Sequence, residues 1–268
     1  MRRWGYRPEL LPPDPDRLFA PMRAWRGVLP TALSLMVDVD PEIYEQGFTG
    51  SCVAQAAAAG ARMVMVLHGN GREADVASPS RRWIYREARA THGDQNEDAG
   101  TYGSAALHVM RVQGWPAEHH MPWSDLASMD PDDARRDAWI CGPPTVTARH
   151  HAIDQAGAIS EHGLIETGDE LEDAIKRSLV AGYPLLCGGL VTRDWQELTD
   201  WWDVCDMRGS VAGGHAMLVV GYDEDGYHLR NSWGAGWGVG GLGRVTRRVV
   251  RDVLRDYHAI TLVRKATT

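Results

Sequence analysis

The hydrophobic pattern differs between the two halves of the chain. In the first half, apolar residues recur at helical spacing or fill alanine-rich runs. In the second half, they form the short apolar or alternating runs that are typical of strands. The predicted helices are 52–68, 81–88, 104–113 and 169–181. The predicted strands are a short one within 30–41, then 152–165, 183–191, 215–222, 227–231 and 242–250.

Helices followed by strands predict an α+β protein with two lobes, a helical lobe over about 45–140 and a sheet lobe over about 141–260. In two other segments, the apolar residues show neither helical nor strand spacing. Residues 1–28 are rich in Pro and Arg, which predicts an extended arm lying on the body of the protein. Residues 117–150 carry many Asp, Pro and Arg, so we expect loops with one short helix there.

Composition disfavours several classes of function. A formal net charge of −8 argues against nucleic acid or an anionic membrane as a partner. The four cysteines are widely spaced and contain no CxxC pair, so neither a metal site nor a disulfide framework is expected. The sequence has no visible secretory leader and no apolar stretch long enough to cross a bilayer, so the cytoplasm is the expected compartment.

The strongest chemical signal is a glycine-containing loop that ends in a cysteine. The loop runs from Gln46 through Gly50 to Cys52, where an alanine-rich helix is predicted to begin. The helix dipole and the unpaired amides at a helix N-terminus favour the thiolate, which is the nucleophilic form of cysteine. Such a nucleophile needs a base and a group that orients the base. Far downstream, His215 follows two glycines and Asn231 opens an Asn-Ser-Trp-Gly run.

Three blocks around these residues resemble the papain-like cysteine peptidases. They are Thr49-Gly50-Ser51-Cys52-Val53 with Gln46 six positions before the cysteine, His215-Ala216-Met217 leading to Gly221-Tyr222, and Asn231-Ser232-Trp233-Gly234 with Trp237-Gly238 and Gly243. The blocks follow one another in the order Cys, His, Asn. The similarity in layout extends over about 29–250 and fits the shorter prokaryotic branch of the family best.

The resemblance implies a papain-like fold with a helical N-terminal lobe, an antiparallel, barrel-like sheet lobe and an active site in the cleft between them. It implies that Cys52 is the nucleophile, that His215 carries the proton and that Asn231 orients the imidazole. Gln46 would donate a hydrogen bond to the oxyanion together with the backbone amide of Cys52. The substrate-binding residues it implies are Gly100, Gly214, Trp233 and Trp237.

The same resemblance implies no metal and no cofactor, a protein or peptide substrate, and a peptidase domain over 29–268. We expect a monomer. No long inhibitory propeptide precedes this domain, so residues 1–28 are expected to act as a short lid, unless latency arises elsewhere.

The sequence departs from the family pattern at three places. Thr49 stands where secreted members carry a half-cystine, which suits a reducing compartment. Val53 replaces the aromatic residue that follows the nucleophile, and the interval from Cys52 to His215 exceeds the usual roughly 130–150 residues.

Two alternatives to hydrolysis stay open. The acyl-enzyme could pass to an amine, as in a transpeptidase or ligase, or the chain could be a catalytically silent binding or assembly module. Retention of all four residues, Gln46, Cys52, His215 and Asn231, disfavours the silent module.

Overall fold

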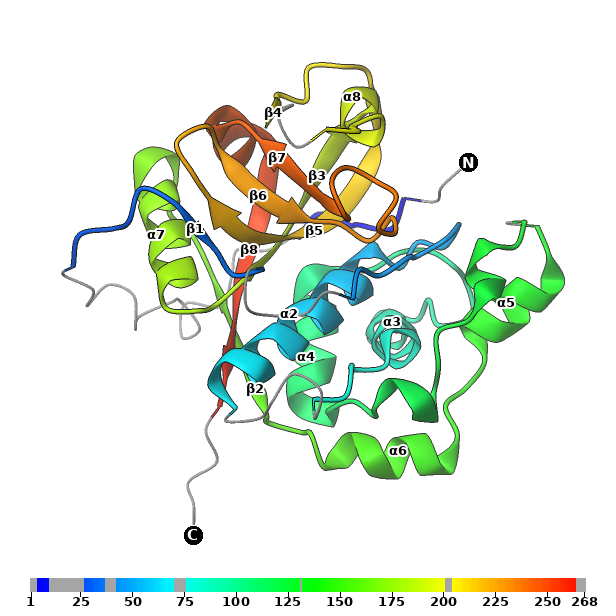
Figure 1. Ribbon diagram of the computed structural model, residues 1–268. Coiled ribbons are helices and arrows are strands. Elements are labelled where there is room, and N and C mark those ends of the chain that lie inside the picture. Colours follow the sequence, from blue (N-terminus) through cyan, green and yellow to red (C-terminus); the bar gives the residue numbers. More distant parts are fainter. Residues whose placement is uncertain are drawn as a thin grey trace, which may run out of the picture.

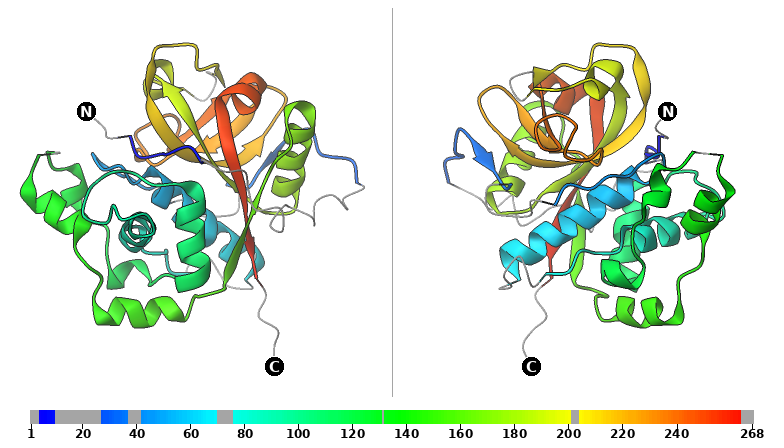
Figure 2. Two further views of the ribbon diagram at one scale, coloured as in Figure 1. Left: turned by 180° about the vertical axis from the view of Figure 1, so that it is seen from behind. Right: turned by 45° about the vertical axis from the view of Figure 1, so that its right-hand side comes forward.

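A computed structural model describes residues 4–9, 27–36, 42–69, 76–130, 132–200 and 204–263. These residues form two lobes, one of helices and one built on a twisted sheet (Figure 1). Within these ranges, no helix combines the length and the apolar character needed to span a bilayer. Residues 4–9 of the N-terminal arm run between the two lobes in all three views (Figures 1 and 2).

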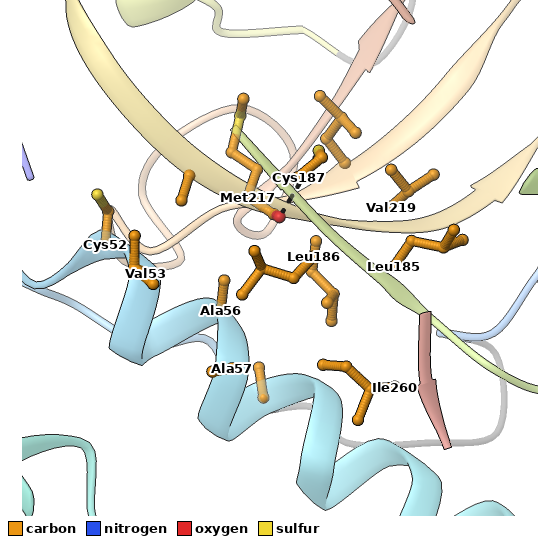
Figure 3. Close-up of a cluster of buried hydrophobic side chains, with 14 of the residues drawn as sticks. Cys52, Val53, Ala56, Ala57, Leu185, Leu186, Cys187, Met217, Val219 and Ile260 are labelled. Atoms are coloured by element: carbon orange, nitrogen blue, oxygen red, sulfur yellow. Dashed lines mark hydrogen bonds between the residues drawn. The ribbon is translucent and has the colours of Figure 1, made fainter. Parts of the chain in front are cut away.

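Helix α2 (Cys52–His68) lies at the boundary of the lobes and contacts both. Residues 52–64 are all buried, because small alanine side chains let the helix approach its neighbours closely. One face packs on the sheet, with Ala56 and Ala57 towards Leu186 and Ile260 (Figure 3). Gly60 favours this close approach, since a Cβ at this position would lie 2.4 Å from Cδ1 of Ile260, whose side chain would have to shift. Helix α2 therefore holds its first residue, Cys52, close to the sheet.

The helical lobe continues with α3 (Arg81–Ala90) and α4 (Gly103–Gln113). The N-cap of α3 is Ser80, whose Oγ accepts a hydrogen bond from the backbone amide of Trp83 at 3.2 Å. The indole of Trp83 in turn donates to the carbonyl of Gly114, just beyond α4. This buried contact joins the two helices.

The segment 117–150 is more helical than the sequence pattern predicts. Its described residues contain two 3₁₀ turns and two α-helices, namely η3 (Glu118–His120), η4 (Asp125–Ser128), α5 (Ala134–Cys141) and α6 (Val146–Ile153), the last of which ends just beyond the segment. The side chains of Asp133 and Thr145 cap α5 and α6 by accepting from the amides of Arg135 and Ala148. These caps explain why short, polar stretches are helical, and our expectation of one short helix was wrong.

In the described part of the chain, the strands form one sheet in the order β2-β8-β3-β5-β6-β7-β4, with β1 paired to β5. The pairs are antiparallel, except that β4 runs parallel to β7. The bounds are β1 (Leu33–Ser34), β2 (Ile159–Gly163), β3 (Leu185–Thr192), β4 (Val204–Cys205), β5 (Val211–Tyr222), β6 (Tyr227–Arg230), β7 (Leu242–Val245) and β8 (Leu254–Leu262). Helices α7 (Gly168–Val180) and α8 (Arg193–Gln196) flank β3 in sequence, and a π-helical turn, η5 (Val249–Val253), leads into β8.

The sequence misplaced several strand boundaries. Residues 152–153 end helix α6, so the strand predicted over 152–165 is only the five-residue β2. The strand predicted over 242–250 ends at Val245, and the following β8 was missed. The missed strand lies between β2 and β3 in the sheet, so both of its edges are paired. Of the short strand predicted within 30–41, β1 is described, whereas 37–41 lie outside the described residues.

Candidate active site

Cys52 is the first residue of α2 and is fully buried. Burial raises the pKa of the Cys52 thiol to about 11, against hydrogen bonds from the backbone amides of Ala216 and Gly5 that lower it. The helix N-terminus by itself favours the thiolate and lowers the pKa of Cys52. In this conformation, the exclusion of water from the sulfur raises the pKa by more. The amide of Ala216 at the sulfur also shows that β5 meets the start of α2 beside residue 215.

His215 and Asn231 are in direct contact. Nε2 of the imidazole lies 2.7 Å from Oδ1 of Asn231, and both side chains are buried. His215 projects from the central strand β5, whereas Asn231 immediately follows the neighbouring strand β6. The indole of Trp233 stacks on the imidazole with ring centroids 4.5 Å apart. The ring is therefore oriented by an amide oxygen and covered by an aromatic plane.

Hydrogen bonds of Gln46 join the loop that ends at Cys52 to the loop that contains Asn231 and Ser232. Its Oε1 accepts a hydrogen bond from Oγ of Ser232 at 2.7 Å, and its backbone amide donates to the carbonyl of Ser232 at 2.9 Å. Its Nε2 donates to the carbonyl of Thr49 at 2.8 Å. A carboxamide nitrogen carries two hydrogens, so one N–H of this fixed group is left for a further acceptor. Ser232 is a supporting residue that sequence reasoning did not assign.

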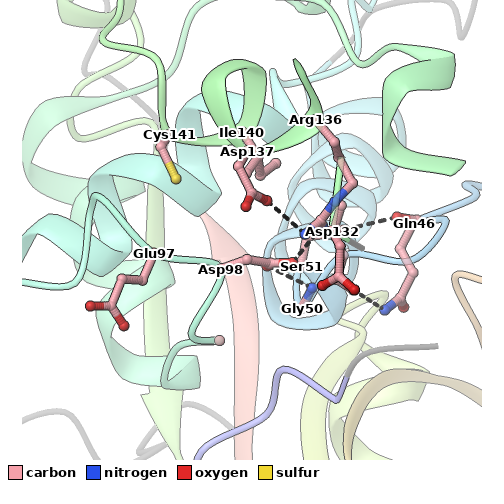
Figure 4. Close-up of polar contacts among 12 residues, drawn as sticks. Gln46, Gly50, Ser51, Glu97, Asp98, Asp132, Arg136, Asp137, Ile140 and Cys141 are labelled. Carbon is pink, nitrogen blue, oxygen red and sulfur yellow. Dashed lines mark hydrogen bonds and ion pairs between the residues drawn. The ribbon is translucent and has the colours of Figure 1, made fainter. Parts of the chain in front are cut away.

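A buried carboxylate, Asp98, joins the cysteine loop to the loop that carries Gly100 (Figure 4). Its Oδ1 accepts from the backbone amide of Gly50 at 2.8 Å and from the Tyr85 hydroxyl at 2.5 Å. That hydroxyl accepts from the amide of Gly100, and the guanidinium of Arg136 donates to Oδ2 of Asp98 at 2.7 Å. Two loops of the site are thus fixed to one charged group.

Asp98→Asn is expected to lower the free energy of unfolding by about 3 kcal/mol, since removing one partner of a buried ion pair leaves the other charge uncompensated. Both side chains are almost fully buried, at 1% exposure for Asp98 and 0% for Arg136. Urea denaturation measures the loss. Asp137→Asn is the matched control: this carboxylate also binds Arg136 but is 52% exposed, so less than about 1 kcal/mol should be lost. Equal losses in the two variants would contradict this account of the network.

Residues 4–9, which we call the strap, lie across this site. The amide of Tyr6 donates to the carbonyl of Gly214 at 3.3 Å, and the strap pairs with Thr101 through two further backbone hydrogen bonds of 3.0 and 2.8 Å. Gly5 passes so close to the cysteine loop that a Cβ on it would lie 1.7 Å from the carbonyl oxygen of Gly50. The strap therefore occupies the position above the sulfur as an extended peptide.

Side chains anchor the strap at both ends. The indole of Trp4 makes edge contacts with the rings of His215 and Trp233, at centroid distances of 6.0 and 6.1 Å. The carboxylate of Glu9 accepts from the amide and hydroxyl of Ser104 at 2.7 and 2.8 Å, in the first turn of α4. An anion at a helix N-terminus is favoured by the unpaired amides and the dipole.

The remaining residues predicted for substrate binding fall into two groups. Gly100 and Gly214 lie directly under the strap, with Cβ positions that would meet backbone oxygens of Gly5 and Tyr6 at 2.3 and 2.7 Å. Trp233 covers the imidazole, whereas Trp237 packs behind it, edge-on at 5.4 Å, and donates its indole N–H to the carbonyl of Trp195. The strap's own aromatic residues were missed, although a Trp-Gly-Tyr run in a polar arm was a visible signal.

Within the described ranges, no group of three or more His, Cys, Asp or Glu side chains is arranged so that it could hold a metal ion. His120 and His151 come together, but their rings stack face to face at 3.8 Å. The four cysteines are all free.

Comparisons with known proteins agree with this geometry. The chain matches the sequence profile described as "Papain family cysteine protease" over residues 38–260. It is 28% identical over 233 residues to an uncharacterised peptidase C1-like protein of Acanthamoeba polyphaga mimivirus, across 84% of this chain and 68% of the viral protein.

Two solved structures are similar along nearly the whole chain. Xylellain, a cysteine protease from Xylella fastidiosa, superposes with a TM-score of 0.80 at 25% identity, covering 97% of this chain and 96% of that one. A procathepsin B from Trypanosoma congolense gives a TM-score of 0.71 at 16% identity, covering 98% of this chain and 87% of that one. At that identity the second likeness concerns the fold alone.

Proposed function

The chain belongs to the papain family of cysteine proteases, and from that premise we propose that it is an endopeptidase whose reaction uses Cys52, His215, Asn231 and Gln46. The two-lobed α+β fold expected from the sequence is confirmed. The observation that carries the proposal is the strap, because an extended peptide already lies over the sulfur with its backbone hydrogen-bonded to both walls. A peptide substrate would use the same backbone groups once the strap has left.

In the proposed reaction, the thiolate of Cys52 attacks the carbonyl carbon of the scissile bond. The oxyanion that forms accepts hydrogen bonds from the amide of Cys52 and from Nε2 of Gln46; one such donor is worth about 3–4 kcal/mol in comparable sites. The imidazolium of His215 then protonates the leaving amine and a thioester remains. His215 next takes a proton from water, which attacks the thioester, and the carboxylic acid leaves with the thiol restored. Asn231 keeps the imidazole of His215 in the same orientation through both steps.

We also propose that the arm acts as a short lid through the strap, and that the enzyme works in a reducing compartment. Residues 4–9 take the place of a substrate backbone and keep water from the sulfur, which agrees with the raised pKa of Cys52. Free thiols at all four cysteines suit a reducing medium.

Labelling with a thiol-reactive epoxide, followed by mass mapping, tests the nucleophile. Only the thiolate reacts, and a pKa near 11 leaves about one thiol in 10⁴ ionised at pH 7. The wild-type rate at Cys52 should therefore rise about tenfold for each pH unit above 7. A variant with a weakened strap, Trp4→Ala/Tyr6→Ala, should be labelled at Cys52 at pH 7, because water and reagent both gain access and the pKa falls.

Cys141 provides the internal control, since it is the one partly exposed cysteine of the four. Labelling of Cys141 with Cys52 left unmodified in the weakened-strap variant would reject Cys52 as the nucleophile. Mass analysis of the products from a denatured protein substrate tests the reaction itself. Internal cleavage with water as the acceptor supports an endopeptidase, whereas peptides joined to an added amine would support the transpeptidase.

A further inference from the structure

A small pocket lies between helix α2 and the strands β5 and β6, next to Asn231. Its volume is about 10 Å³, and its walls come from α2, from β5, from residues 230–232 at the end of β6 and from Tyr44. All of the residues that line it are buried. A space of this order holds one water molecule when polar groups surround it.

Two buried polar atoms of the lining residues have no hydrogen-bond partner within the described part of the chain. They are Nδ2 of Asn231 and Oε1 of Gln55, in residues that are 3% and 1% exposed. One of these atoms is a donor and the other is an acceptor. Because an unsatisfied buried polar group is costly, a water molecule that binds both atoms would stabilise the site.

The hydrogen bonds of Asn231 identify which end of its carboxamide is the donor. Its Oδ1 accepts from the backbone amide of Ser232 at 2.8 Å and lies 2.7 Å from Nε2 of His215. A backbone amide can only donate, so the atom that meets it is the oxygen. The nitrogen of Asn231 is therefore the end that is left for a further acceptor.

A chain of hydroxyl groups fixes the carboxamide of Gln55 in the same way. Oγ1 of Thr49 donates to the carbonyl of Gln46 at 2.8 Å, and Oγ of Ser51 lies 2.7 Å from that hydroxyl. Each hydroxyl has one hydrogen, so Ser51 donates to Thr49 and its own oxygen must accept. Nε2 of Gln55 is the donor to Ser51, at 3.1 Å. The oxygen of Gln55 is therefore the end that is left for a further donor.

We propose that one water molecule occupies this pocket, accepts a hydrogen bond from Nδ2 of Asn231 and donates one to Oε1 of Gln55. The water satisfies the donor end of Asn231 and restrains rotation of its carboxamide, so that Oδ1 stays on the imidazole of His215. Gln55 is thus a positioning residue that acts through the water and Asn231. This inference rests on the proposed peptidase function, because it adds a residue to the same site.

A crystal structure of the wild-type chain tests the water directly. One water peak is expected at about 2.7–3.2 Å from both Oε1 of Gln55 and Nδ2 of Asn231. Arg230 also lines the pocket, so a chloride ion is the alternative occupant. An empty pocket, or a peak whose anomalous signal identifies chloride, would overturn the proposal.

Two substitutions of Gln55 test the positioning role in the weakened-strap background. Gln55→Met keeps the size of the side chain but removes Oε1, whereas Gln55→Glu keeps an oxygen there whether or not the carboxyl is ionised. Since misplacement of a catalytic group can cost up to about 100-fold, Gln55→Met is expected to lower kcat about tenfold and to leave KM within about twofold. Gln55→Glu should keep kcat within about threefold of the parent, because water can still donate to the oxygen.

A role in packing alone predicts the opposite order, since a buried site tolerates methionine better than a carboxyl group. A higher kcat for Gln55→Met than for Gln55→Glu would therefore contradict the positioning role, as would a change confined to KM. Gln113→Met makes the same chemical change at the exposed last residue of α4 and should leave kcat and KM within about twofold.

The two experiments separate this inference from the proposed function. If the weakened-strap parent cleaves no peptide, the peptidase proposal fails and the role of Gln55 in the reaction fails with it. The crystal structure needs neither activity nor a substituted chain, so it still decides whether water binds between Gln55 and Asn231. If the water is present and both Gln55 variants keep the parent kcat, the positioning role is rejected while the peptidase proposal stands.

Discussion

The Trp4→Ala/Tyr6→Ala double variant is expected to cleave peptides about 100- to 1000-fold faster than the wild-type chain at neutral pH. Trp4 loses its contacts with His215 and Trp233, and Tyr6 loses its buried ring contacts and its bond to Asp256. Buried aromatic anchors of this kind contribute about 2 kcal/mol each to binding, and each 1.4 kcal/mol is a factor of ten. Initial rates on a fluorogenic peptide measure the change.

Pro8→Ala is the matched control for this result, because Pro8 belongs to the strap but is exposed. Its rate should stay within about fivefold of wild type, since the change acts mainly on chain entropy. A synthetic Trp-Gly-Tyr-Arg-Pro-Glu peptide, added to the double variant, should restore inhibition. Equal rates in wild type and the double variant would mean that the strap does not close the cleft in solution.

Cys52→Ser in the weakened-strap background is expected to lower kcat/KM by at least about 10⁴-fold, comparable to the loss of a nucleophile in other triad enzymes. The hydroxyl is nearly isosteric but far less ionised than a thiol, so attack on the carbonyl becomes the slow step. The activity measured against the same fluorogenic peptide should fall to background. Residual activity near the parent level would assign the reaction to another residue or to a contaminant.

Cys187→Ser is the control for the effect of changing a buried thiol to a hydroxyl. Cys187 is a buried thiol like Cys52, but it lies in β3 with its Sγ towards the carbonyl of Met217 (Figure 3). Burial of the new hydroxyl is expected to lower the melting temperature, which a thermal melt records, but kcat/KM should stay within about tenfold.

Local sequence patterns predicted α2 and the three motif blocks well, because those signals lie in consecutive residues. Helices α5 and α6 escaped the pattern because their capping residues, Asp133 and Thr145, are common in loops as well. Strand β8 escaped because its bulge at Asp256 interrupts the alternation on which the prediction depends.

Contacts between distant residues lie beyond such patterns. The hydrogen bond of Gln46 to Ser232 and that of Gly50 to Asp98 join segments whose proximity only the folded chain reveals. The strap is the extreme case, since Tyr6 and Asp256 are 250 positions apart. The family resemblance led us to expect a lid in residues 1–28, but the contacts that residues 4–9 make are visible only in the folded chain.

The network at Asp98 has a practical consequence for the chemistry of the site. A thiol nucleophile must be protected from oxidation, and the reductants that protect it also open disulfide bridges. In this chain, Thr49 stands at the family's half-cystine position and the neighbouring amide of Gly50 is held by an ionic group instead. We therefore expect dithiothreitol or glutathione at millimolar concentration to keep the proposed nucleophile, Cys52, reduced while the loop around it stays in place.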